Sequence, residues 1–79
     1  MAPAIVSALA TVGTEVEQAV ARYGPFHSAH EGYAVILEEV DELWDEVKKS
    51  PRRRDLAAMK AEAVQVAAMA VRFLMDVTP

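Results

Sequence analysis

Hydrophobic residues recur every three or four positions along almost the whole chain, which is the spacing of one face of an α-helix. The first such stretch runs from about Pro3, which suits a first helical turn, to about Tyr23, before the stop signal Gly24-Pro25. Its apolar stripe consists of Ile5, Leu9, Val12, Val16, Ala19, Val20 and Tyr23. No segment alternates apolar and polar residues as a strand would. The pattern predicts an all-α chain.

A second helix is expected over about 29–49. Ser28 is followed three residues later by Glu31, which is the capping-box signature of a helix start, and Ser50-Pro51 ends the stretch. At about 100° per residue the apolar and acidic side chains separate onto opposite faces. One face carries Tyr33, Ile36, Val40, Leu43, Trp44 and Val47, and the other carries Glu31, Glu38, Glu39, Glu42, Asp45 and Glu46.

A third helix is expected over about 55–77, with Asp55 as its cap. From Ala63 to Met75 it is apolar on almost all sides, and two helices of one small subunit cannot cover such a surface. A chain of 79 residues without cysteine also lacks disulfides to stabilise a small core. We therefore expect a homodimer or homotetramer in which third helices pack across the interface. One polar line interrupts the apolar surface: Glu62, Gln65, Met69, Arg72 and Asp76.

Charge is distributed unevenly. The net charge is −4, and five of the eight basic residues form one short group that begins in the last turn of the second helix: Lys48, Lys49, Arg52, Arg53 and Arg54. An acidic chain with so short a basic group is not expected to bind a nucleic-acid polymer. No apolar run reaches the roughly 18 to 20 residues of a membrane span, and no basic residue precedes Arg22 as a secretory signal requires. We expect a single soluble, cytoplasmic domain over 1–79.

Six of the twelve acidic residues lie within nine positions of the second helix, from Glu38 to Glu46. Like charges at this spacing repel, so the run requires solvent or a cation. Glu39 and Glu42 stand three residues apart, and Glu62 is expected opposite them on the third helix. Carboxylate oxygens in such a cluster are the ligands that Mg²⁺ and Mn²⁺ prefer. The alternative is an acidic helix face that is simply solvated.

The arrangement resembles the MazG-like branch of the all-α nucleoside triphosphate pyrophosphatases, whose signature is an ExxE pair, a loop and an ExxD pair on the next helix. The matching residues are Glu38-Glu39-Val40-Asp41-Glu42, nineteen intervening residues, and then Glu62-Ala63-Val64-Gln65. The resemblance covers roughly residues 28–75 and implies an oligomeric helical bundle with metal ligands at Glu39, Glu42 and Glu62. The family's final aspartate is replaced by Gln65, which offers a neutral carbonyl oxygen. Glu38 is the expected substitute for the missing charge, and the number of metal ions stays open.

The resemblance implies Mg²⁺-dependent cleavage of a (deoxy)nucleoside triphosphate between its α and β phosphorus atoms, with Mn²⁺ able to replace Mg²⁺. Glu38 or Glu39 would orient the attacking water or accept its proton. The segment from Phe26 to Tyr33 is similar to that of phage-type members acting on dATP and dGTP. Candidate substrate contacts are Lys48, Lys49, Arg52, Arg53 and Arg54 for the leaving pyrophosphate, Arg72 for a phosphate and Trp44 for the base.

Each substrate contact has a structural alternative: a solvated loop for the basic group, core packing for Trp44, and for Arg72 an ion pair with Glu62, Asp76 or an acidic residue of a partner subunit. Gln65 also keeps two other functions open. One is a non-catalytic helical interaction module, and the other is a family member that binds nucleotide without turnover. The base and sugar preference is not fixed by the sequence.

Overall fold

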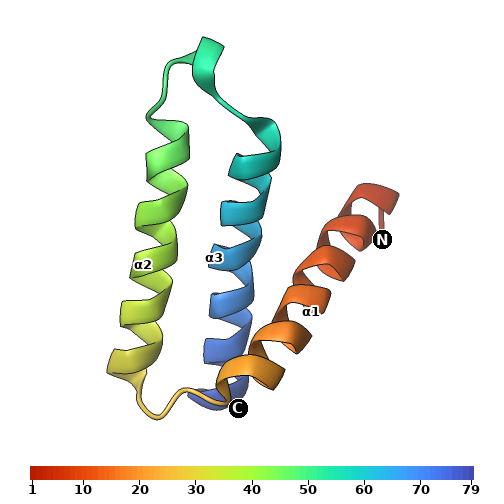
Figure 1. Ribbon diagram of the computed structural model, residues 1–79. Coiled ribbons are helices and arrows are strands. Elements are labelled where there is room, and N and C mark those ends of the chain that lie inside the picture. Colours follow the sequence, from red (N-terminus) through yellow and green to blue (C-terminus); the bar gives the residue numbers. More distant parts are fainter.

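The computed structural model describes all 79 residues and contains three α-helices, one short 3₁₀ turn and no strand. The helices are α1 (Pro3–Tyr23), α2 (Ala29–Val47) and α3 (Leu56–Asp76), and the 3₁₀ turn η1 (Pro51–Arg53) lies in the loop between α2 and α3 (Figure 1). The all-α prediction is confirmed. The structure contains no helix with the length and hydrophobicity of a membrane span.

Side chains cap the starts of α2 and α3 at the predicted residues. The Ser28 hydroxyl accepts the Glu31 N–H (3.0 Å), and the Asp55 carboxylate accepts the N–H groups of Ala57 and Ala58 (2.9 and 3.2 Å). The Glu31 carboxylate reaches the N–H of His27 (3.0 Å), one residue before the cap, so the reciprocal bond of the capping box is displaced.

The helix α2 ends at Val47, two residues earlier than predicted. Pro51, four residues after Val47, has no N–H for the Val47 carbonyl oxygen, and the Arg54 guanidinium donates two hydrogen bonds to that oxygen instead (3.0 and 2.8 Å). A side chain seven residues later thus supplies the hydrogen-bond donors that another helical turn would have supplied to this carbonyl oxygen.

Two of the helices form an antiparallel pair, α2 against α3, and α1 packs on α3 without contacting α2 (Figure 1). The small core lies where α1 crosses α3. It consists of Val16, Ala19, Phe26, Ala68 and Met69. Close packing continues at the start of α2, where Gly32 is buried beside the Phe73 ring.

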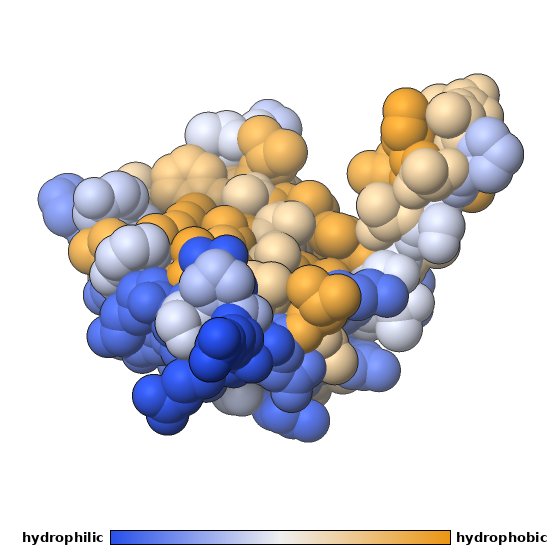
Figure 2. All heavy atoms as spheres, turned by 90° about the horizontal axis from the view of Figure 1, so that it is seen from above, coloured by the Kyte–Doolittle hydropathy of each residue, from blue (hydrophilic) through white to orange (hydrophobic).

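Much of the predicted apolar surface is uncovered within one subunit. On α2, Ile36, Leu43 and Val47 are half-buried on the α3 side. An outward stripe at four- and three-residue spacing is exposed: Tyr33, Leu37, Val40 and Trp44. On α1, the N-terminal half extends beyond the rest of the molecule as an arm (Figure 2), and its Ile5 and Leu9 are exposed.

Candidate functional site

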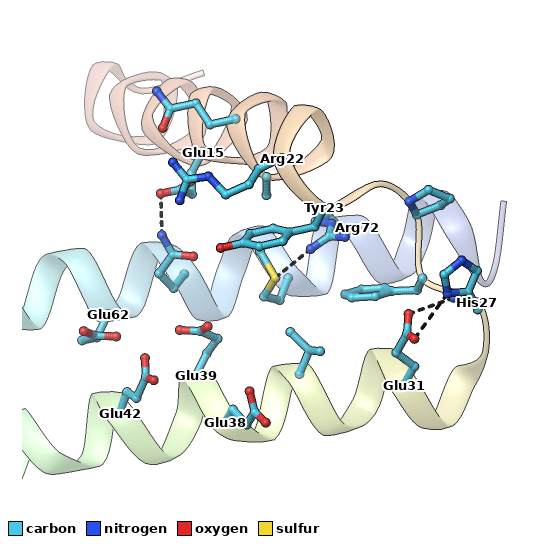
Figure 3. A pocket seen from close by; sticks show the side chains of 17 residues that line it. Glu15, Arg22, Tyr23, His27, Glu31, Glu38, Glu39, Glu42, Glu62 and Arg72 are labelled. Atoms are coloured by element: carbon cyan, nitrogen blue, oxygen red, sulfur yellow. Dashed lines mark hydrogen bonds and ion pairs between the residues drawn. The ribbon is translucent and has the colours of Figure 1, made fainter.

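A groove lies between α1 and α2, with α3 at its base, because α1 crosses α3 without reaching α2. It has a volume of about 700 Å³. The α2 and α3 walls present Glu38, Glu39, Glu42, Glu62, Gln65 and Arg72, and the α1 wall presents Glu15, Arg22 and Tyr23 (Figure 3).

The predicted carboxylates meet at one position in this groove. One oxygen each of Glu39, Glu42 and Glu62 lies within 4.8 Å of the others (Figure 3). The three-residue spacing puts Glu39 and Glu42 on one face of α2, and the antiparallel α3 brings Glu62 against them. Glu39 and Glu62 are half-buried, and the Oε2 atom of each is inaccessible to solvent with no hydrogen-bond partner.

This environment disfavours ionisation. The pKa of Glu39 is raised to about 7, first by burial, then by the charge of Glu42 and a hydrogen bond shared with it when one of the two is protonated, and then by the charges of Glu62 and Glu38. The pKa of Glu62 is also raised, first by burial and then by Glu42. Two desolvated carboxylate oxygens without partners require either a proton or a cation. The chemistry of the donors fits a hard divalent ion, and Glu39, Glu42 and Glu62 could hold Mg²⁺ or Mn²⁺.

Glu38 and Gln65, the two residues predicted for the fourth ligand position, both line the groove but do not lie in equivalent places. Glu38 is exposed and lines the groove outside the group of three. Gln65 faces the groove one turn beyond Glu62, and its Nε2 donates a hydrogen bond to Oε1 of Glu15 (Figure 3). The role of Glu15 was not predicted, since its position depends on where α1 crosses α3, which no local sequence signal gives.

Arg72 is the most deeply buried charged residue, only 3% exposed. Its guanidinium donates to the Gly24 carbonyl (2.6 Å) and to the Met69 sulfur (3.3 Å), and it lies over the Phe26 ring, 4.3 Å from the ring centroid. The Nε atom has no partner. Of the ion pairs offered as alternatives for Arg72, those with Glu62 and Asp76 do not form. Asp76 accepts the Phe26 N–H instead (2.9 Å).

The other predicted substrate contacts do not line the groove of their own subunit. Lys48 pairs with Asp45 (3.0 Å) and Lys49 with Glu46 (2.9 Å), and Arg54 caps α2. Arg52 and Arg53 are exposed in η1, and Trp44 is 58% exposed on the outward stripe. The cation that does line the groove from α1 is Arg22, which sequence reasoning did not single out.

Comparison of the chain with protein-family models, curated proteins and solved structures finds no match. The resemblance to the MazG-like family therefore stays a prediction, based on the two helical motifs and their order.

Proposed function

We propose that the protein is a Mg²⁺-dependent nucleoside triphosphate pyrophosphohydrolase of the MazG-like type, which releases a nucleoside monophosphate and pyrophosphate. The observation that carries the proposal is the convergence of Glu39, Glu42 and Glu62 within 4.8 Å in a groove. Two of these carboxylates have buried oxygens without partners, which is costly unless a ligand satisfies them.

The chemistry divides between the metal and the chain. Bound Mg²⁺ would polarise the attacked phosphoryl group and lower the pKa of a water molecule. The chain supplies the ligands and a proton acceptor. Glu38 is suited to accept the proton, because it is exposed in the groove, next in sequence to Glu39, and outside the group of three.

Size and charge of the groove support a nucleotide substrate. A volume of about 700 Å³ lies in the range typical of small-molecule sites. Two arginines line the groove, Arg22 from α1 and Arg72 from α3, and neither forms an ion pair with a carboxylate. They are the cations available to phosphate oxygens that the metal does not neutralise. The deoxynucleotides dATP and dGTP are the first substrates to test.

The uncovered surface supports a homodimer. The accessible surface is 5679 Å², whereas a compact monomer of 8.6 kDa should expose about 4,700 Å². The excess is about 1,000 Å², similar to the roughly 800 Å² that each partner buries in an ordinary stable interface. The stripe Tyr33, Leu37, Val40 and Trp44 has the 4-3-4 spacing of a helix–helix seam, so we propose that it packs against a second copy.

The test is turnover of a panel of ribo- and deoxynucleoside triphosphates with Mg²⁺ or Mn²⁺, followed by pyrophosphate and monophosphate release. Glu42→Gln should abolish turnover, because it removes one ligand of the three. Asp41→Asn is the matched control, since Asp41 is exposed on the same helix and does not line the groove.

Two negative outcomes separate the alternatives. Nucleotide-dependent stabilisation without product would identify a binder without turnover, to which the neutral Gln65 side chain would be suited. No turnover, together with no rise in melting temperature on adding metal, would overturn the site and favour an interaction module.

A further inference from the structure

The contact between Gln65 and Glu15 joins α1 to the carboxylate cluster on α2 and α3. Gln65 lies three residues after Glu62, on the same face of α3, and both line the groove. Its Nε2 donates to Oε1 of Glu15, and this hydrogen bond is partly buried (Figure 3). Glu15 forms no ion pair. A carboxylate in a groove is thus satisfied by a neutral amide.

The orientation of an amide decides what it offers a cation. Its oxygen is a ligand, whereas its NH₂ group carries two donors that a cation repels. An ionised carboxylate can only accept hydrogen bonds, so Glu15 engages the NH₂ group and leaves the Oε1 atom of Gln65 for another partner. Without Glu15 the two ends of the amide could exchange by a half-turn.

A second observation in the same groove points to a ligand. Arg72 is only 3% exposed, it forms no direct ion pair, and its Nε has no hydrogen-bond partner. A buried charged donor without a partner is costly. The groove therefore combines carboxylate oxygens that lack a cation with a guanidinium N–H that lacks an acceptor, and a metal bound to a triphosphate carries both kinds of partner.

We propose that Glu15 is a positioning residue, which holds the Gln65 amide so that its carbonyl oxygen faces the metal ion bound by Glu39, Glu42 and Glu62. The inference rests on the proposed metal site and explains how the chain functions without a carboxylate at position 65. Glu15 sits next to Val16, which packs in the core at the α1–α3 crossing, so the packing of α1 fixes the orientation of a ligand on α3.

The test is Mn²⁺ affinity, measured by titration calorimetry and by the electron paramagnetic resonance of free Mn²⁺, without nucleotide. Glu15→Gln should weaken Mn²⁺ binding about 10- to 100-fold, as loss of an orienting partner does at other metal sites. Glu17→Gln is the matched control, because it removes the same charge from an exposed residue of α1 outside the groove, and its affinity should equal that of the unmodified chain.

A double-variant cycle separates orientation from charge or folding. In a Gln65→Asp background both oxygens are equivalent and need no orienting, so adding Glu15→Gln should not weaken Mn²⁺ binding further. If Glu15→Gln loses helix content by circular dichroism, Glu15→Asp provides a second variant. It keeps the negative charge but shortens the side chain by one methylene, so the carboxylate no longer reaches the Gln65 amide.

The outcomes distinguish this inference from the proposed function. If the unmodified chain binds no Mn²⁺ and cleaves no nucleotide, both fail together. If it binds Mn²⁺ but Glu15→Gln matches Glu17→Gln, or costs the same in both backgrounds, the metal site stands and the role of Glu15 is overturned.

Discussion

Glu39 is a proposed metal ligand, and its raised pKa also links the stability of the folded chain to pH. Its pKa is raised, mainly by burial, to about 7 in the folded chain, whereas an ordinary glutamate has a pKa of about 4.5. Between these values the folded state binds more protons than the unfolded state, so the free energy of unfolding falls as the pH rises through this window. Without metal, we expect the melting temperature to fall from about pH 5 to about pH 7.5.

In Glu39→Gln this decline should be smaller, because the group that titrates is gone. Mg²⁺ at the higher pH should restore the melting temperature of the unmodified chain, since a cation replaces the proton among the carboxylates. Thermal unfolding followed by circular dichroism measures both effects. Identical pH profiles for the two chains would show that Glu39 ionises normally.

Arg22 and the basic loop are competing candidates for phosphate binding. Arg22 lines the groove, whereas Arg52 is exposed in η1. A hydrogen bond to a charged group contributes about 1.5–3 kcal/mol, so Arg22→Gln should lower kcat/KM for the triphosphate by at least about tenfold. Arg52→Gln removes the same charge and should leave kcat/KM unchanged. The reverse ranking would restore the loop as the phosphate contact.

The site could be predicted from sequence only where its residues depend on helical spacing. Glu39 and Glu42 share a face at a three-residue interval, and the order of helices places Glu62 near them. Glu15 and Arg22 reach the groove through the crossing of α1 over α3, which is a tertiary property without a local signal. The basic loop was assigned by charge alone, although Arg54 serves to cap α2.

At the scale of the elements, local chemistry predicted the helix ends well. Ser28 and Asp55 cap α2 and α3, and Gly24 follows α1 with a φ of 72°, a conformation in which glycine is favoured. The helix α2 ends two residues before its predicted end, at Val47, whose carbonyl oxygen accepts hydrogen bonds from Arg54, seven residues later. Local patterns do not contain such a contact.

Two glycines inside helices should respond oppositely to alanine. A Cβ atom on Gly32 would lie 2.7 Å from a Phe73 ring carbon, so Gly32→Ala should destabilise the chain by about 1–3 kcal/mol through overpacking of α2 against α3. A Cβ on Gly13 would meet nothing within 4 Å, and Gly13→Ala should stabilise α1 by about 0.5–1 kcal/mol. Urea unfolding measures both. Equal effects would contradict the close α2–α3 approach at Gly32.

The whole molecule shows why a single subunit looks incomplete. Only seven of its 79 residues are buried, and the α1 arm carries Ile5 and Leu9 beyond the bundle into solvent (Figure 2). The sequence correctly indicated that α3 has more apolar surface than two helices cover, since Ala63, Ala70 and Leu74 are exposed. The sequence did not indicate that half of the apolar face of α2 would also be exposed. That exposure depends on which side of α2 packs against α3, which is a tertiary property.

The α2 stripe provides the sharpest test of assembly. Leu37 is 44% exposed in the middle of this stripe, so Leu37→Glu would place a charge at the centre of the proposed seam, where a buried carboxylate has no partner. Light scattering after size exclusion should give about twice 8.6 kDa for the unmodified chain and about 8.6 kDa for this variant. Ala21→Glu adds the same charge at an exposed position of α1, outside both the stripe and the groove, and should leave the dimer intact. A monomeric unmodified chain would exclude this seam, and a dimer that survives Leu37→Glu but not Ala21→Glu would move the interface to α1.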